Sequence, residues 1–363
     1  MIFIADATGG CLFGSEYSAP ITAALWATIA SIAASFLLLS YTVELRVQRR
    51  FRERRRARVI ARWRTIIGKA VTGAADGRAP PSLPRRQRAE VLRLWNYTRS
   101  MIEGAAADRL IALAVELGLR EFARKQARQA HLGTRLTALQ ALGRLRDCDM
   151  FDEILAATDD DNTLVAITAA EALAEIDSRL AVAVLIPKLA QRRDWPRTHV
   201  FSLLEKAGSA VISEPLYRCI RAASDTDAAY LLQFAEIAEF DVRDALAVEL
   251  LRSRSDAELL AAALKVASGY GIRIELDAFL DHPVWYVRMQ AAALLGRMGR
   301  AEDVDRLEKR LSDQEWWVRY RAAKALVALP TLSRQALEEI RSRLRDPYAC
   351  DVLEQALAEA AIR

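Results

Sequence analysis

The chain has 363 residues, with 52 Lys and Arg against 47 Asp and Glu, so its net charge is +5. Half of the residues are hydrophobic, which excludes an intrinsically disordered polymer, and the low Gly and Pro content argues against a turn-rich all-β protein. The four cysteines are far apart and form no Cys-x-x-Cys pair, which excludes a zinc knuckle and a disulfide framework. The positive charge alone would be compatible with nucleic-acid binding, so its position along the chain decides its meaning.

The N-terminal region contains a segment without any Asp, Glu, Lys, Arg or His, from residue 17 to residue 43. As a helix, residues 19–43 are long enough to cross the roughly 30 Å hydrocarbon core of a bilayer. No Lys or Arg precedes this segment, whereas an arginine-rich block follows it at once. The positive-inside rule then predicts a single-pass protein of a bacterial inner (plasma) membrane, with residues 1–18 outside and the remainder cytoplasmic.

Two other interpretations of the N-terminus are weaker. A cleaved signal peptide would need a basic region before a shorter apolar core, and the basic region is missing. Lipid modification of Cys11 is disfavoured because no hydrophobic region precedes it.

The excess positive charge is confined to the segment after the apolar run. Residues 44–69 carry 11 basic and 2 acidic residues, whereas the chain from residue 70 onward carries 41 basic and 43 acidic residues. Attraction to anionic lipid headgroups is one interpretation of this segment, and a role in topology alone is the other. The charge distribution disfavours nucleic-acid binding. The residues predicted to meet headgroups are Arg49, Arg50, Arg54, Arg55 and Arg56.

Small residues recur at every fourth position of the predicted membrane helix. They are Ala23, Ala27, Ser31 and Ser35. Such a face lets a second helix approach closely in the bilayer, although Ala and Ser are also simply tolerated in membrane spans. The pattern does not distinguish self-association from a foreign partner.

After a Gly- and Pro-rich segment at residues 73–84, the chain repeats itself about every 31 residues. Three apolar columns with helical spacing persist through eight units, and one of them consists of Leu142, Leu173, Leu204, Ala235, Leu264, Leu295, Leu326 and Leu357. We therefore predict an all-α protein, with one N-terminal transmembrane helix followed by an α-solenoid of about eight helical pairs. The predicted parts are a short extracytoplasmic N-terminus at 1–18, the transmembrane helix at 19–43, a basic juxtamembrane helix at 44–72, a linker at 73–84 and the solenoid at 85–363.

Two of the repeats carry a fuller motif, in which an Asp is followed by Val-Arg and then by spaced Ala and Leu. These residues are Asp281, Val287, Arg288, Ala291 and Leu294 in one unit, and Asp313, Val318, Arg319, Ala322, Ala325 and Leu326 in the next. The motif resembles HEAT repeats, in particular the short bacterial HEAT-like type also found in phycobilin lyases. The resemblance covers roughly residues 130–363 and implies a solenoid that binds other proteins.

We find no catalytic or metal-binding constellation in the sequence. Motifs for nucleotide binding, for a serine nucleophile and for HExxH zinc sites are all missing. The acidic run from Asp159 to Asn162 lacks the Gly and the distal Glu of a calcium loop, and we expect it to cap a helix instead. No catalytic residue, metal ligand or cofactor is therefore predicted.

Aromatic side chains adjoin the arginine of the motif at the start of several second helices. The residues concerned are Trp195, Arg197, Trp285, Tyr286, Arg288, Trp316, Trp317 and Arg319, with Tyr348 in the last unit. In a structural interpretation, each Arg bonds to a turn Asp of a neighbouring unit and the aromatics seal the edge between repeats. In a functional interpretation the residues form a strip that binds a partner, because Trp, Tyr and Arg anchor many interfaces.

These features predict a non-enzymatic, membrane-anchored scaffold with a cytoplasmic solenoid. We expect its partner to be another protein, with membrane helices of its own, and prefer a membrane-embedded glycosyltransferase that makes a polysaccharide. A regulator that senses a small anionic ligand is the alternative. An enzyme resembling HEAT-like DNA glycosylases or bilin lyases is less favoured, because the soluble part has no net positive charge and the chain carries an anchor.

Overall fold

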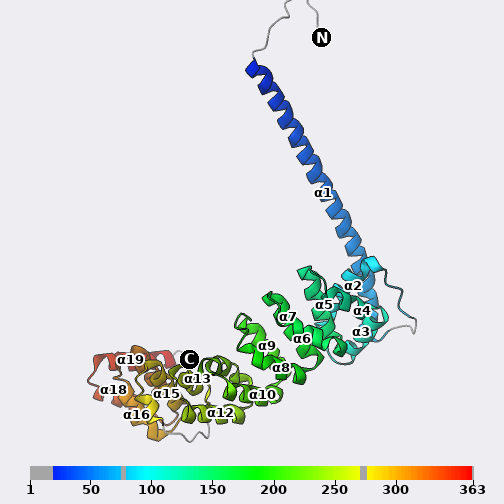
Figure 1. The fold of residues 1–363 in the computed structure, drawn as a ribbon. Coiled ribbons are helices and arrows are strands. Elements are labelled where there is room, and N and C mark those ends of the chain that lie inside the picture. The colour runs from blue at the N-terminus through cyan, green and yellow to red at the C-terminus, as the bar shows by residue number, and fades with distance from the viewer. Residues whose placement is uncertain (1–18, 75–78, 270–275, 362–363) are drawn as a thin grey trace, which may run out of the picture. The chain divides into compact units, whose positions relative to one another are not determined.

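The computed structural model describes residues 19–74, 79–269 and 276–361, and every regular element within them is a helix (Figure 1). The prediction of an all-α protein is thereby confirmed for the described residues. By its contacts the chain divides into two compact units, one made of residues 1–98 and 102–113, the other of residues 99–101 and 114–363.

The first unit contains α1 (Ala19–Thr72), the 3-10 turn η1 (Arg85–Gln87) and most of α2 (Arg88–Arg99) and α3 (Ala105–Glu116). The second unit contains α4 (Leu119–Ala127), α5 (Leu132–Arg144), η2 (Cys148–Met150), α6 (Phe151–Ala157), α7 (Thr163–Ile176), α8 (Ser178–Leu189), α9 (Arg197–Ala207), α10 (Ser209–Ala222), α11 (Asp225–Leu232), η3 (Ala235–Ile237), α12 (Phe240–Ser253), α13 (Ala257–Val266), α14 (Asp277–Leu280), α15 (Trp285–Met298), η4 (Ala301–Asp303), α16 (Val304–Arg310), α17 (Trp316–Ala328), α18 (Arg334–Arg343) and α19 (Pro347–Ala361).

Helix α1 joins the predicted membrane segment and the basic segment without a break. It has 54 residues, which at 1.5 Å per residue makes it about 80 Å long. Its apolar part is the one stretch of the described residues that is long and apolar enough to cross a membrane, and none of that stretch is buried within the protein. The helix ends at Thr72, next to the Gly- and Pro-rich segment.

The C-terminal end of α1 packs into the first unit. Trp63 and Ile67 are buried, and the Trp63 indole Nε1 donates to Gln87 Oε1 at 3.0 Å. The Arg109 guanidinium on α3 donates to the last carbonyls of α1, at 3.1 Å to Ala70 and 2.6 Å to Val71. The last turns of the basic segment are therefore part of a folded core, and the segment is not joined to that core only through the Gly- and Pro-rich linker.

The start of the predicted solenoid also differs from the structure. Residues 85–98 and most of α3 belong to the unit that contains α1, whereas the solenoid was expected to begin at residue 85. The buried Trp95 explains this placement, since its indole Nε1 donates to the Leu110 carbonyl at 2.8 Å within the first unit. Sequence periodicity did not reveal this, because α2 and α3 do not share the 31-residue repeat.

The second unit is a stack of antiparallel helix pairs. From α4 with α5 to α18 with α19, eight such pairs follow one another in the described residues. The second helices lie side by side, as contacts of α5 with α7 and of α13, α15, α17 and α19 in succession show (Figure 1). The first helices α8, α10 and α12 are neighbours in the same way. This arrangement confirms the predicted solenoid-like repeat.

The three apolar columns form the core of the stack. Every member is buried except Leu357, which is half-buried because α19 is the last helix of the described residues and none of them packs over it. One step of the repeat, from Ala235 to Leu264, is 29 residues long and not 31. The unit that contains Ala235 also has the shortest second helix of the eight pairs. Helix α11 has only eight residues, and the column continues through Phe234 and Ala235 at the short η3 turn.

Candidate interaction surface

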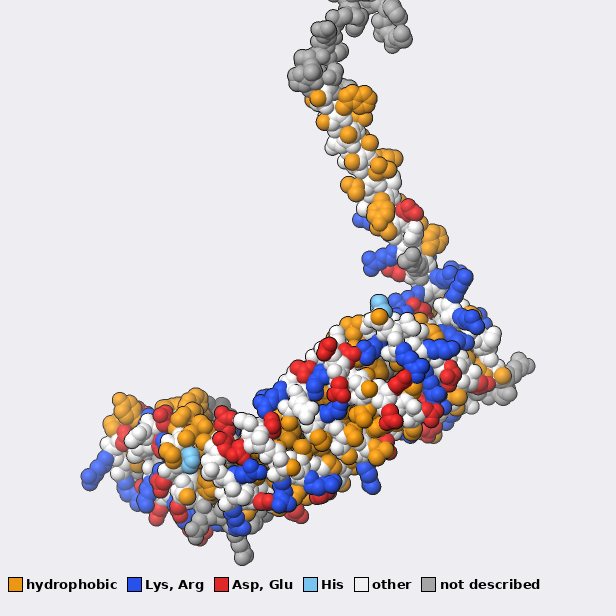
Figure 2. All heavy atoms as spheres, in the orientation of Figure 1, with side chains coloured by type: hydrophobic (Ala, Val, Ile, Leu, Met, Phe, Trp, Pro, Cys, Tyr) orange, Lys and Arg blue, Asp and Glu red, His pale blue; other side chains and the backbone are white. Residues whose placement is uncertain are grey.

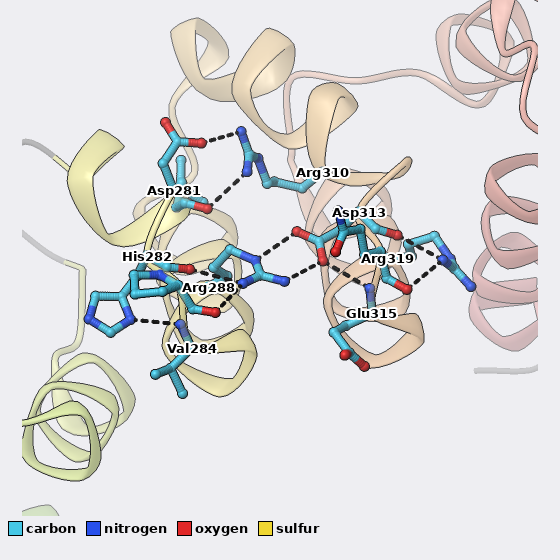
Figure 3. A network of polar contacts seen from close by, with 11 residues as sticks. Asp281, His282, Val284, Arg288, Arg310, Asp313, Glu315 and Arg319 are labelled. Atoms are coloured by element: carbon cyan, nitrogen blue, oxygen red, sulfur yellow. Dashed lines mark hydrogen bonds and ion pairs between the residues drawn. The ribbon is translucent and has the colours of Figure 1, made fainter.

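Arginine–aspartate contacts hold the turns between successive helix pairs (Figure 3). Arg288, on the first turn of α15, donates from Nε and Nη2 to the two carboxylate oxygens of Asp313, both at 2.8 Å. Its Nη1 donates to the carbonyl of His282 at 2.9 Å. The side chains of Arg288 and Asp313 are only 13% and 6% exposed. The structural interpretation therefore holds for Arg288, all three nitrogens of which are engaged within the fold.

The charged state of this pair is set by opposing effects. Burial pushes the pKa of Asp313 upward, but the Arg288 guanidinium and the Glu315 N–H stabilise the carboxylate more strongly, so its pKa lies below the usual value. The hydrogen bond to Asp313 likewise raises the pKa of Arg288. Asp313 also shapes the turn before α17, because its Oδ1 accepts from the Glu315 N–H at 3.0 Å.

The same contact recurs in the second unit with variations. Arg135 on α5 bonds to Asp160 at 2.6 Å, 25 residues later, which is the spacing of Arg288 and Asp313. Arg319 instead donates to the Asp313 carbonyl at 2.7 Å, and its guanidinium lies over the Tyr348 ring at 5.7 Å. Arg319 therefore contacts both the turn before α17 and the exposed ring of Tyr348.

Sequence analysis missed a second series of ion pairs between units. In each, a cation follows its acid by 29 residues, a constant spacing that a search for paired charges would have found. The pairs are Lys188 with Asp159 at 2.5 Å, Arg254 with Asp225 at 2.6 Å, Arg306 with Asp277 at 3.0 Å and Arg310 with Asp281 at 2.8 Å.

The acidic run before α7 caps that helix, as predicted. Asn162 Oδ1 accepts from the Leu164 N–H at 3.0 Å, and Asp160 Oδ1 accepts from the Asn162 N–H at 2.9 Å. Asp159 and Asp160 are further engaged by Lys188 and Arg135. Within the described ranges, no group of three or more His, Cys, Asp or Glu side chains is arranged to hold a metal ion.

Four exposed aromatic side chains gather at the start of α15, α17 and α19. We call Trp285, Trp316, Trp317 and Tyr348 the C-terminal aromatic surface; Trp317 is 53% and Tyr348 67% exposed. The Trp316 and Trp317 rings meet edge to face with their centroids 4.7 Å apart. Hydrophobic side chains are gathered over this end of the second unit in Figure 2.

The Trp316 ring of this surface is supported by a hydrogen-bonded network between α17 and α19. The Trp316 ring stacks on Tyr320 at 5.0 Å, and the Tyr320 hydroxyl donates to Glu359 Oε2 at 2.8 Å. Lys324 Nζ donates to the same oxygen at 2.9 Å. Hydrogen bonds from Lys324, Tyr320 and Gln355 lower the pKa of Glu359 to about 2. The Trp316 ring is therefore preorganised, which reduces the conformational entropy that a partner would have to remove on binding to it.

The predicted strip is not continuous along the solenoid. Trp195 is only 2% exposed and lies under the Arg192 guanidinium at 5.6 Å, so it is not an accessible anchor. The reason is its position two residues before α9, whereas Trp285 and Trp316 are the first residues of their helices. Arg197 is exposed, but the two intervening second helices begin with Asp225 and Ala257, so neither has an aromatic residue at the position that Trp285 and Trp316 occupy. Tyr286 is half-buried against Trp285.

The predicted membrane-facing and lipid-facing side chains of α1 are all exposed. This holds for the small residues Ala23, Ala27, Ser31 and Ser35 and for the arginines Arg49, Arg50, Arg54, Arg55 and Arg56. Hydrophobic side chains cover the upper part of α1 and cationic ones its lower part in Figure 2. The packing and headgroup contacts expected of them stay predictions.

Comparison with known proteins supports HEAT-type repeats at the C-terminal end of the chain. Residues 272–361 match the family model for HEAT repeats, which confirms the resemblance for that part of the chain. A crystal structure of an engineered protein is 17% identical and covers 81% of this chain and 88% of its own, with a TM-score of 0.33. A designed armadillo repeat protein is 17% identical and covers 68% of this chain and 95% of its own, with a TM-score of 0.21. No curated protein matches the chain.

Proposed function

We propose that the protein is a non-enzymatic, membrane-anchored scaffold, whose helical repeats bind a partner protein through the C-terminal aromatic surface. The observation that carries this proposal is the exposure of four large aromatic side chains on adjoining helices of a repeat fold. Large, rigid and partly apolar rings are the side chains that dominate binding energy at interfaces. Helical repeats of this type commonly bind protein partners, and an isolated soluble domain has no evident need to keep such rings in water.

Helix α1 supplies the proposed anchor. The apolar side chains of this helix are not buried within the protein, and a bilayer would remove them from water while the helix keeps its backbone hydrogen bonds. The arginines that follow it favour a cytoplasmic location for the two folded units. Because α1 continues without a break to the buried Trp63, a helical strut of about 30 Å would separate Val43 from the packed end of this helix.

The length of this strut refines the proposed lipid contacts. Arg49 and Arg50 lie about 10 Å beyond Val43 along the helix axis, within the reach of headgroups and of one Debye length. Arg54, Arg55 and Arg56 lie about 17–20 Å beyond it, so they reach headgroups only when α1 is strongly tilted. We therefore propose Arg49 and Arg50 as the principal lipid contacts.

The proposed partner is an integral membrane protein. The exposed face of Ala23, Ala27, Ser31 and Ser35 would let a partner helix approach α1 closely in the bilayer. A polysaccharide-synthesising glycosyltransferase is our preferred example of such a partner, on the general layout of an anchor and a scaffold and not on any residue specific to sugars.

Purification of the full-length chain from mild detergent, with mass spectrometry of co-eluting proteins, tests this proposal. We expect a stoichiometric membrane protein with the native chain and its loss with the double variant W317A/Y348A. Leu180→Ala is the matched control, since it removes a side chain that is 56% exposed on α8, away from the aromatic surface. Circular dichroism should show the same helicity in all three proteins. Equal recovery of the partner with W317A/Y348A and with native protein would overturn the proposed docking surface.

A further inference from the structure

A cleft opens between three successive second helices at the N-terminal end of the solenoid. It has a volume of about 120 Å³ and is lined by residues of α5, α7 and α9. Its walls are polar and apolar in about equal parts and carry charges of both signs. The lining side chains are Gln140, Arg144, Thr168, Glu171, Ala172, Ala174, Glu175, Ser202, Leu203 and Lys206.

Because the units repeat, the cleft can be compared with the equivalent positions at the other end of the stack. At the other end of the stack, Lys324 on α17 pairs with Glu359 on α19 at 2.9 Å, across 35 residues. Glu171 on α7 and Lys206 on α9 occupy the equivalent positions, with the charges exchanged. This pair does not form, because Glu171 Oε1 is taken by His199 Nδ1 at 2.8 Å. Lys206 has no hydrogen bond or ion pair among the residues that the structure describes.

Glu175 is the second charge in the cleft without a partner. It stands one repeat before Lys206 and one after Arg144, and among the described side chains it accepts no hydrogen bond. Burial raises the pKa of Glu175, whereas the positive charges of Arg144, Lys206 and Arg99 act in the opposite direction. The side chains of Glu175 and Lys206 are both exposed, so a ligand can reach them from solvent. A carboxylate and an ammonium thus face one space from two walls, each lacking a counter-charge at bonding distance.

We infer that this cleft binds a small zwitterion with a carboxylate and an ammonium group, as in an α-amino acid. The ligand carboxylate would accept from Lys206, and the ligand ammonium would donate to Glu175. Gln140, Thr168 and Ser202 line the same space and offer further neutral hydrogen bonds. The volume fits a small molecule and excludes a helix or a folded loop. The site lies outside the aromatic surface, so the inference does not depend on the proposed scaffold function.

Calorimetric titration of the full-length chain in detergent with glycine and L-alanine tests the inference. We expect saturable binding of both, and none of acetate or methylammonium, each of which supplies one of the two charges. Glu175→Gln and Lys206→Met should each weaken binding by about tenfold to a hundredfold, the range expected when one charge-assisted hydrogen bond is lost.

Lys324→Met is the matched control, because it removes the ammonium at the other end of the stack, where the pair is closed. It should leave binding unchanged. Thermal unfolding of each variant separates a loss of fold from a loss of binding, and K206M, at an exposed site, should keep the native midpoint. Absence of saturable binding by the native chain at millimolar ligand would overturn the site, as would unchanged affinity in both E175Q and K206M.

Discussion

At the scale of single residues, Arg288 and Asp313 show how the repeat motif acts. Two parallel hydrogen bonds tie the first turn of α15 to the turn before α17, and both side chains are largely buried. Removing one member of a buried pair leaves the other charge without compensation, which costs more than the pair itself contributes. Arg310 and Asp281 form a similar bond at 2.8 Å, but the Asp281 carboxylate is 71% exposed and is screened by water.

We therefore expect Asp313→Asn to lower the free energy of unfolding by about 3 kcal/mol, and Asp281→Asn by less than about 1 kcal/mol. Urea unfolding followed by circular dichroism would measure both. Because the pKa of Asp313 is depressed in the folded state, its contribution is present above the unfolded pKa, near 4, and is lost as the pH falls through the folded pKa. D313N should weaken the acid dependence of stability below pH 4. Equal costs for the two substitutions would show that burial does not set the strength of these pairs.

At the scale of helices, small residues in the apolar core set how closely the second helices approach. A Cβ added at Gly296 on α15 would lie 2.7 Å from the Ala325 Cβ on α17. A Cβ at Gly143 on α5 would lie 2.7 Å from the Ala172 Cα on α7. The glycines therefore bring neighbouring backbones together at both ends of the stack. Sequence alone predicted the apolar columns but not this close approach, which depends on the angle between helices.

Gly296→Ala is expected to destabilise the second unit by about 1–3 kcal/mol, because an extra methyl group must push α15 and α17 apart. Gly133→Ala serves as the control. Its added Cβ would approach the His131 ring no closer than 3.5 Å, and Ala is the better helix former, so stability should stay equal or rise by up to about 1 kcal/mol. Thermal unfolding midpoints of the two variants would decide. Comparable midpoints would mean that the helices can separate at little cost.

At the scale of the whole molecule, a long helix connects an apolar segment to a folded unit. Trp63 and Ile67 bury the end of α1, and the Arg109 guanidinium binds its last carbonyls. Any tilt that a membrane imposed on α1 would consequently be passed to the first unit and would not be absorbed by the Gly- and Pro-rich segment. The proposed topology follows from the asymmetry of charge around the apolar segment.

The topology is testable with a native cysteine. Cys148 is exposed at the start of η2 in the second unit. In a Cys11→Ser variant, a membrane-impermeant maleimide should fail to label Cys148 in intact cells and should label it after the membrane is permeabilised. Extraction with alkaline carbonate should leave the protein in the membrane fraction. Labelling of Cys148 in intact cells would reverse the orientation, and release by carbonate would remove the proposed anchor.

The sequence by itself determined the features that repeat. Because an apolar stripe must be covered by the next pair, the recurring Ala and Leu positions predict both the helices and their stacking, and all but the terminal Leu357 are buried. The bond of Arg288 to a turn Asp was one of the two interpretations that the sequence allowed, and the structure decided between them for this residue.

Only the tertiary structure decided which side chains remain accessible. Trp195 and Trp316 both stand near an inter-helix turn, yet one is buried and the other exposed, because they differ by two residues in register with their helices. Trp63 packs beside Gln87, which lies 24 residues later in the chain. Glu175 and Lys206 line one cleft although 31 residues separate them. Such contacts are set by helix geometry, which a pattern of residue types does not contain.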